Sequence, residues 1–268
     1  MQREKRIGIT VSNTKSFSTS CSPFRQEPVV AMPLIHLTEI ELASRTSLCL
    51  LVDLSDFSHA GLRHLESLLS SSERQQYANI VADTERKRRQ TTRAVLRLVL
   101  GQLTGVSPAQ VRLGIGKHGK PYMISPRDVG FSVSHSSAFS LLAFAEDAKI
   151  GCDIERNAPL DELHGLSKVV LHPEEAETIF NLNGRAAQDA FLRNWVRKEA
   201  VLKAMGVGFS VDPTQLKVGL ESSEIQLRLA DDDAAVSVFN LHCTTPAEGY
   251  LAAVASPYPA CQWRTLSI

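Results

Sequence analysis

The sequence predicts an α+β protein in which long helices alternate with short strands. Two long stretches, residues 83–103 and 191–208, carry apolar residues at helical spacing. Short apolar or alternating segments, bounded by turn residues, predict strands between and after them. The chain has 268 residues, enough to bury one large hydrophobic core or two of ordinary size.

Composition excludes several classes of protein. Hydrophobic residues make up 43% and charged residues 22%, as in soluble globular proteins. Lys plus Arg and Asp plus Glu both number 29, so no overall attraction to nucleic acid or membrane follows. No apolar run approaches the ~20 residues of a membrane span. The five scattered cysteines form no CxxC pair, which favours a reducing, cytoplasmic location over a disulfide framework or a zinc site: Cys21, Cys49, Cys152, Cys243 and Cys261.

Residues 1–33 differ in composition from the rest of the chain. They are rich in Ser and Thr, and basic residues outnumber Glu4 and Glu27. We expect a disordered extension, or a start codon placed too early with Met32 as the true start. An organellar transit peptide is the alternative, because the segment lacks the apolar core of a secretory signal.

The remaining elements are expected in the following order. The predicted helices are residues 59–70, 73–80, 83–103 with Asp83 as N-cap, 161–170, 173–181 and the long helix that ends at Gly206. The predicted strands are residues 47–54, 111–115, 130–137, 139–145 and 149–155. Five later segments suggest a mostly antiparallel sheet: 215–218, 224–229, 235–241, 250–255 and 262–266.

The helix at residues 83–103 begins with a basic run. A solvated face or an RNA-binding patch would account for such a run. It lacks the aromatic residues that stack on bases, so nucleic acid fits poorly. Phosphate on a small molecule fits better, because guanidinium groups match phosphate oxygens. The run contains Arg86, Lys87, Arg88, Arg89, Arg93 and Arg97.

Two loops before residue 140 also suit an anion. Gly119 permits a turn and Pro121 holds Lys120 in an extended conformation, although Gly-Lys-Pro is a common turn sequence. His135 ends a predicted strand between Ser134 and Ser136. A lone histidine is more often structural than catalytic, but hydroxyl neighbours at a strand end favour anion binding.

Carboxylates recur in two later elements. In the strand at residues 149–155, a period of two places Asp153 and Glu155 on one face, where they repel each other unless a hard cation such as Mg²⁺ lies between them. An exposed edge strand is the alternative. In the last helix, Trp195, Glu199 and Lys203 are four apart and share a face. A surface Glu–Lys pair worth ~0.2–0.5 kcal/mol would explain only the last two.

Together these stretches resemble a known family. The ordered set is GKP at 119–121, FSVSHS at 131–136, GCDIE at 151–155 and WVRKEAVLKAMGVG at 195–208. It resembles the Sfp-type 4′-phosphopantetheinyl transferases, and a weaker likeness extends from residue 47 to the last strand. The resemblance implies two pseudo-twofold-related α/β lobes, residues 34–146 and 147–268, with the active site in the cleft between them.

The resemblance also implies the reaction and its residues. A monomeric enzyme would move the phosphopantetheine arm of coenzyme A to a serine of an apo carrier protein, with Mg²⁺, releasing 3′,5′-ADP. Asp153, Glu155 and Glu199 resemble the metal ligands. Lys203 resembles the lysine at the pyrophosphate. Ser134 and His135 resemble contacts to a coenzyme A phosphate, and Lys120 and Arg89 resemble contacts to the nucleotide end.

Some assignments differ from the family pattern or stay open. Arg88 or Arg93 could stand in for Arg89. Some family members carry two basic residues three apart farther upstream, and here Arg74 is followed by Tyr77 at the second position. Glu199 would act as the base directly or through water. The rival functions are a non-catalytic carrier or nucleotide binder and a Mg²⁺-dependent pyrophosphate hydrolase. Whether the carrier serves fatty-acid, polyketide or peptide synthesis is left open.

Overall fold

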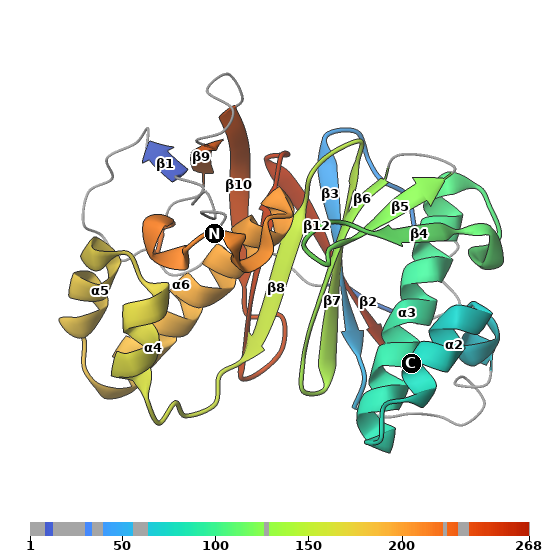
Figure 1. Cartoon of the computed structure of the whole chain (residues 1–268), viewed down its shortest axis with the longest axis horizontal. Helices are drawn as coiled ribbons and strands as arrows, with labels where there is room; N and C mark the ends of the chain where they lie inside the picture. Colours follow the sequence, from blue (N-terminus) through green and yellow to red (C-terminus); the bar gives the residue numbers. More distant parts are fainter. Residues whose placement is uncertain are drawn as a thin grey trace, which may run out of the picture.

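A computed structural model describes residues 9–12, 30–33, 40–55, 64–125, 129–221, 224–229 and 236–267. Within these ranges the chain mixes helices and strands, which confirms the α+β prediction. Two five-stranded sheets lie in the middle of the molecule, with helices on the outside (Figure 1). None of the described helices combines the length and apolar character needed to cross a membrane.

The first sheet has the strand order β2-β12-β3-β7-β6. Strands β3, β7 and β6 are antiparallel neighbours, whereas β12 runs parallel to both β2 and β3. The bounds are β2 Val30–Pro33, β3 Thr46–Asp53, β6 Val129–Ser136, β7 Phe139–Glu146 and β12 Ala260–Ser267.

The second sheet has the order β1-β9-β10-β11-β8 and is antiparallel throughout. This agrees with the antiparallel sheet expected beyond Gly208. The bounds are β1 Ile9–Ser12, β8 Gly151–Arg156, β9 Glu224–Leu229, β10 Val236–Thr244 and β11 Tyr250–Ser256.

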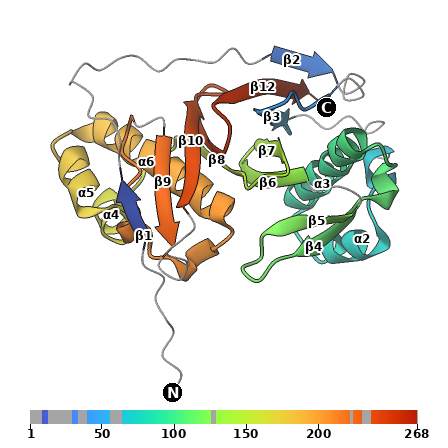
Figure 2. The ribbon, with the colours of Figure 1, turned by 90° about the horizontal axis from the view of Figure 1, so that it is seen from above.

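The helices lie outside the sheets, and a two-stranded hairpin lies beside α3 (Figure 2). Figure 2 shows α3 beside the first sheet and α6 beside the second, at opposite ends of the molecule. The bounds are α2 Ser71–Ala78, α3 Asp83–Thr104, α4 Leu163–Val170, α5 Pro173–Phe180 and α6 Gly184–Met205, with the hairpin strands β4 Arg112–Ile115 and β5 Pro121–Ser125.

Strand alternation divides the core into three layers. Leu50 and Val52 of β3 pack in the cluster that includes the apolar face of α3. On β11, Ala253 and Ala255 pack in the cluster of α6. The alternate residues, such as Leu51 and Val254, meet in a third cluster between the two sheets. Each sheet is therefore buried on both faces, with a helix on its outer side.

The last strand corrects one prediction. Residues 262–266 were expected to extend the antiparallel sheet after Gly208, but β12 lies in the first sheet, parallel to β3 and β2. Its Trp263 and Leu266 are almost fully buried, on opposite faces of that sheet. Because it buries an apolar residue on each face, the strand can lie inside the sheet between β2 and β3. The local alternation of residues predicts a strand but not which sheet it joins.

Several local predictions also change. Residues 215–218 are not a strand, because the 3₁₀ turn Pro213–Gln215 precedes an irregular segment. Asp83 is the first residue of α3 rather than its N-cap, which is Ala82. In the extension predicted to be disordered, the structure has two short strands, β1 at Ile9–Ser12 and β2 at Val30–Pro33. The prediction of disorder is therefore wrong for these eight residues. Residues 1–8, 13–29 and the start of the helix expected at 59–70 lie outside the described residues.

Candidate active site

Helix α6 and strand β8 present charged side chains to each other. Lys203 Nζ lies 2.6 Å from Asp153 Oδ1. One end of α6 therefore meets β8 at Asp153, and Trp195, two turns earlier, lies close enough to Glu155 to lower the pKa of that carboxyl. Glu199 lies between Trp195 and Lys203 on the helix, and its pKa responds to both strand carboxylates. The shared helical face predicted from the four-residue spacing thus faces the predicted carboxylate face of β8.

Glycine makes the close approach of the two elements possible. A Cβ placed on Gly151 would lie 2.0 Å from the Ala200 carbonyl oxygen and 2.3 Å from the Ala204 nitrogen, both in α6. A side chain there would push the strand away from the helix. The helix ends at Gly206, whose φ of 68° favours glycine, and its amide donates to the Leu202 and Lys203 carbonyls.

Hydroxyls of β6 complete the cluster. Ser134 Oγ donates to Asp153 Oδ1 at 2.7 Å and accepts from Lys203 Nζ at 3.1 Å. Ser136 Oγ donates to Glu155 Oε2 at 3.0 Å and accepts from the Arg156 amide. These bonds join the edge strand of the first sheet to the edge strand of the second, so residues from both sheets form one site. Ser136 was not among the predicted site residues, although the alternation of small hydroxyls in FSVSHS signals it.

The three carboxylates are held in an environment that resists their ionisation. Burial raises the pKa of Asp153, although the Lys203 ammonium and Ser134 act in the opposite direction. Burial and the charge of Asp153 raise the pKa of Glu155. Burial raises the pKa of Glu199, and both neighbouring carboxylates add to the increase. Burial disfavours the charge of Lys203, but Asp153 outweighs it and raises the lysine pKa.

The donors in this cluster have the chemistry of a site for a hard divalent cation. Asp153 Oδ2 and Glu199 Oε1 are buried and accept no hydrogen bond from the described residues. Buried carboxylate oxygens without donors are costly unless a cation satisfies them. The described side chains do not, as they stand, bring three such residues close enough to form a metal-binding group. The site therefore suits a divalent cation by the chemistry of its carboxylate oxygens, not by a preformed arrangement of ligands among the described residues.

Lys120 reaches toward the same region from the loop between β4 and β5. Its Nζ donates to the Ile150 carbonyl, one residue before β8, at 2.9 Å. Its Cδ lies 3.7 Å from the position of a Cβ on Gly206, at the end of α6. Burial lowers the pKa of Lys120 to about 8. The predicted cation is thus held near the site, but as a partly buried group rather than a displayed one.

Predicted anion contacts are divided between the two faces of β6. Ser134 points toward β8, as its bond to Asp153 shows. His135 is exposed and contributes to lowering the pKa of Glu85 on α3. Glu85 in turn forms an ion pair with Arg89 of the same helix, at 2.5 Å. Neighbouring residues of a strand point to opposite faces, so Ser134 and His135 do not share one pocket as adjacent contacts. His135 and Arg89 thus both lie near Glu85, whereas Ser134 contacts Asp153 and Lys203.

Other arginines of the basic run have different surroundings. The Arg88 Nε is buried without a hydrogen-bond partner among the described residues. Arg93 Nε donates to the Tyr77 hydroxyl at 3.2 Å. Arg97 is buried and binds Glu73 and two backbone carbonyls, which is a structural role. Arg74 donates to the Leu69 carbonyl. Arg88 is therefore the member of the run best suited to a ligand, and Arg89 could bind one only in competition with its partly exposed partner Glu85.

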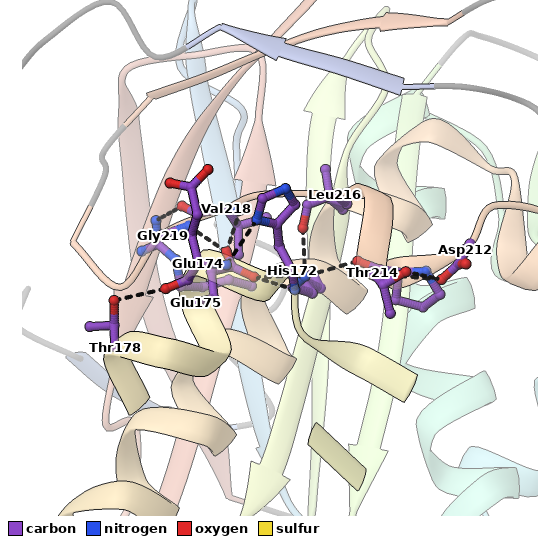
Figure 3. A network of polar contacts seen from close by, with 12 residues as sticks. His172, Glu174, Glu175, Thr178, Asp212, Thr214, Leu216, Val218 and Gly219 are labelled. Carbon is purple, nitrogen blue, oxygen red and sulfur yellow. Dashed lines mark hydrogen bonds and ion pairs between the residues drawn. The ribbon is translucent and has the colours of Figure 1, made fainter. Parts of the chain in front are cut away.

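A buried ion pair that the sequence analysis overlooked supports α6. Lys198 is completely buried and donates to Glu175 Oε2 at 2.8 Å and to the Pro213 and Leu216 carbonyls. Glu175 Oε1 accepts from the Val218 and Gly219 amides at 2.7 and 2.8 Å (Figure 3). Burial alone would raise the pKa of Glu175, but Lys198, with further contributions from Asn194 and the Gly219 amide, lowers it. The network holds α5 and residues 213–219 against the turn of α6 that precedes Glu199.

Comparison with known proteins identifies the family of the chain. The model of the 4′-phosphopantetheinyl transferase superfamily matches residues 149–255, from two residues before β8 into β11. The 4′-phosphopantetheinyl transferase HetI of Nostoc is 30% identical over 197 residues, which cover 68% of this chain and 83% of HetI.

More distant relatives carry the same kind of name. The 4′-phosphopantetheinyl transferase of Bacillus subtilis is 28% identical over 146 residues, 54% of this chain and 58% of its own. The human L-aminoadipate-semialdehyde dehydrogenase-phosphopantetheinyl transferase is 24% identical over 185 residues, 62% and 60% of the two chains. The chain therefore belongs to the 4′-phosphopantetheinyl transferase superfamily, and it is an enzyme that transfers phosphopantetheine.

Proposed function

We propose that this enzyme transfers the phosphopantetheine arm of coenzyme A to a serine hydroxyl of an apo acyl- or peptidyl-carrier protein, with Mg²⁺, and releases 3′,5′-ADP. The observation that carries the proposal is the contact of α6 with β8, where Lys203 pairs with Asp153 and Glu199 lies close enough to Asp153 and Glu155 for their charges to raise its pKa. Transfer from a pyrophosphate requires neutralised phosphoryl oxygens and an aligned hydroxyl, and this set of groups suits both needs.

Asp153, Glu155 and Glu199 are the residues that would hold Mg²⁺. The ion would neutralise charge on the pyrophosphate oxygens. Support comes from the two buried carboxylate oxygens without hydrogen-bond donors.

Glu199 and Lys203 take the proton-transfer and charge-stabilising roles. Glu199 accepts the proton of the carrier serine, directly or through a water. Its raised pKa makes it a stronger base at neutral pH than an exposed carboxylate. Lys203, held by Asp153 and Ser134, stabilises or protonates the leaving phosphate. Asp153 thus positions Lys203 as well as binding metal.

The nucleotide end of coenzyme A is assigned to residues before Glu146. Lys120, His135 and Arg89 bind its phosphates, with Arg88 as an additional ligand, and Ser134 contacts it from the carboxylate side. Under this proposal coenzyme A lies in a cleft between residues 34–146 and 147–268, with the exception of β12, which packs in the sheet of the first part. Serine bonds between β6 and β8 support a site built from both parts. Action as a monomer in the cytoplasm stays a prediction.

A mass measurement tests the reaction. Several apo carrier proteins, incubated with enzyme, coenzyme A and Mg²⁺, should each gain one phosphopantetheine unit if they are substrates. Release of 3′,5′-ADP should require the carrier. Release without a carrier would instead identify a pyrophosphate hydrolase, and neither product nor mass gain would indicate a non-catalytic binder.

Lys120 gives the proposal a pH signature. Because its pKa is about 8, it is charged at pH 7 and largely neutral at pH 9. If it binds phosphate, the KM for coenzyme A should rise by about tenfold over this range, a loss of roughly 1.4 kcal/mol of binding. Lys120→Ala should raise KM already at pH 7, with a smaller effect on turnover. Lys120→Arg, which keeps its charge, should flatten the profile; an unchanged profile would remove Lys120 from phosphate binding.

The basic run provides a matched comparison. Arg88→Ala and Arg89→Ala should each raise the KM for coenzyme A by roughly tenfold, the scale of one charge-assisted hydrogen bond. Arg93→Ala should change KM little, since Arg93 is engaged with Tyr77 and Glu73. Steady-state kinetics of the three variants decide the assignment, and a large KM effect confined to Arg93 would reverse it.

A further inference from the structure

Two cysteines far apart in the sequence lie in contact. Cys49 Sγ of β3 and Cys261 Sγ of β12 are 2.8 Å apart. These strands are parallel neighbours in the first sheet, and Cys261 lies opposite Ser47, two residues before Cys49. Residues two apart share a face of a strand, so both sulfurs lie on the face that packs between the two sheets.

The two thiols differ in their access to solvent. Cys49 is fully buried, whereas Cys261 is partly exposed at the start of β12. The other described cysteines are engaged elsewhere: Cys152 donates to the Leu141 carbonyl, and Cys243 accepts from Arg197. An oxidant would therefore reach Cys261 first and find the Cys49 sulfur beside it.

We propose that Cys49 and Cys261 form a thiol oxidation site. When a hydroperoxide oxidises this site, the two cysteines become joined by an intramolecular disulfide. In the first step the Cys261 sulfur attacks the peroxide; an S–O bond forms, the O–O bond breaks, and water leaves when hydrogen peroxide is the oxidant. In the second step the Cys49 sulfur attacks Cys261; the S–S bond forms, the S–O bond breaks, and the second water leaves. The two thiols lose two electrons and the peroxide gains them.

Formation of the bond requires the two sulfurs to move closer. The sulfurs must approach from 2.8 Å to about 2.05 Å. Cys261 is the second residue of its strand, directly after the turn that follows β11, so the end of the strand can move. The bond would tie the last strand to the first long strand. Because a cross-link between residues so far apart restricts the unfolded chain strongly, oxidation should stabilise the fold.

The test uses the full-length protein and one equivalent of hydrogen peroxide. Intact mass should fall by two hydrogens, and peptide mapping without reductant should recover the Cys49 and Cys261 peptides linked. The melting temperature should rise by several degrees and return after treatment with dithiothreitol. Cys243→Ser should behave like the wild type. Cys261→Ser, at the partly exposed position, should fold and lose both the mass change and the rise.

Other outcomes would overturn the proposal. Oxygen retained on Cys261 as sulfenic acid, or as sulfinic acid once more peroxide is added, would show that Cys49 does not resolve the oxidised thiol. A disulfide that includes another cysteine, or a covalent dimer, would assign the reactivity elsewhere. Cys49→Ser is a second check, since Cys261 should then accumulate oxygen rather than form a bond; if that variant does not fold, Cys261→Ser alone still decides.

Discussion

Glu199→Gln is expected to lower turnover by at least ~100-fold, the scale of one preorganised electrostatic contact, while raising the melting temperature of the metal-free protein. Glutamine keeps the shape of the side chain but cannot accept the serine proton or carry charge to a metal. The same change removes a carboxylate whose Oε1 is buried without a hydrogen-bond donor. Activity and stability should therefore move in opposite directions.

The stability change has a definite pH dependence. Burial and the neighbouring carboxylates raise the native pKa of Glu199 above its unfolded value. Ionisation in the native state therefore costs stability at pH values above both, and the cost disappears as the pH falls through the raised native pKa. Thermal unfolding of the variant and wild type should differ at pH 8 by a few degrees and converge toward pH 4; 1 kcal/mol corresponds to roughly 2–4 °C.

Two other variants make this result specific. Glu177→Gln removes an exposed carboxylate of α5 and should change neither turnover nor melting temperature. Asp153→Ala should also lower turnover by ~100-fold or more, but without the stabilisation, since it leaves Lys203 without its ion-pair partner. Added Mg²⁺ should raise the melting temperature of the wild type more than that of Glu199→Gln. Near-normal turnover in either active-site variant would contradict the roles assigned to its carboxylate.

Lys198→Met is expected to destabilise the protein by about 3–5 kcal/mol, because it leaves the buried Glu175 carboxylate without its partner. The melting temperature should fall by roughly 10 °C or more. Three strong donor contacts of the ammonium are lost, two of them to backbone carbonyls of residues 213–216. Chemical denaturation followed by circular dichroism measures the effect.

A neighbouring ion pair serves as the control. Lys217 and Glu174 join the same segment and helix, but both side chains are substantially exposed. Lys217→Met should therefore cost no more than about 1 kcal/mol. Combining Lys198→Met with Glu175→Gln should recover part of the loss, because the second change removes the unpaired charge. Equal effects of Lys198→Met and Lys217→Met would show that the buried pair does not hold α6.

Local periodicity determined much of this protein from sequence. The four-residue spacing of Trp195, Glu199 and Lys203 required one helical face, and α6 presents that face to β8. The two-residue period of β8 required Asp153 and Glu155 to share a side. Both results follow from backbone geometry that holds wherever the element lies. The succession of helices and strands was predictable for the same reason.

Long-range packing decided the rest. The alternation in residues 262–266 reports a strand, but its parallel position beside β3 depends on contacts more than 200 residues away along the chain. In the sequence, nothing distinguishes Lys198 from other helix lysines; its contacts with Glu175 and two backbone carbonyls form only in the folded protein. Burial likewise sets the pKa of Lys120 and the carboxylates. The sequence by itself determined which residues share a face, whereas only the tertiary structure decided what each face meets, since burial and pairing are properties of segments distant along the chain.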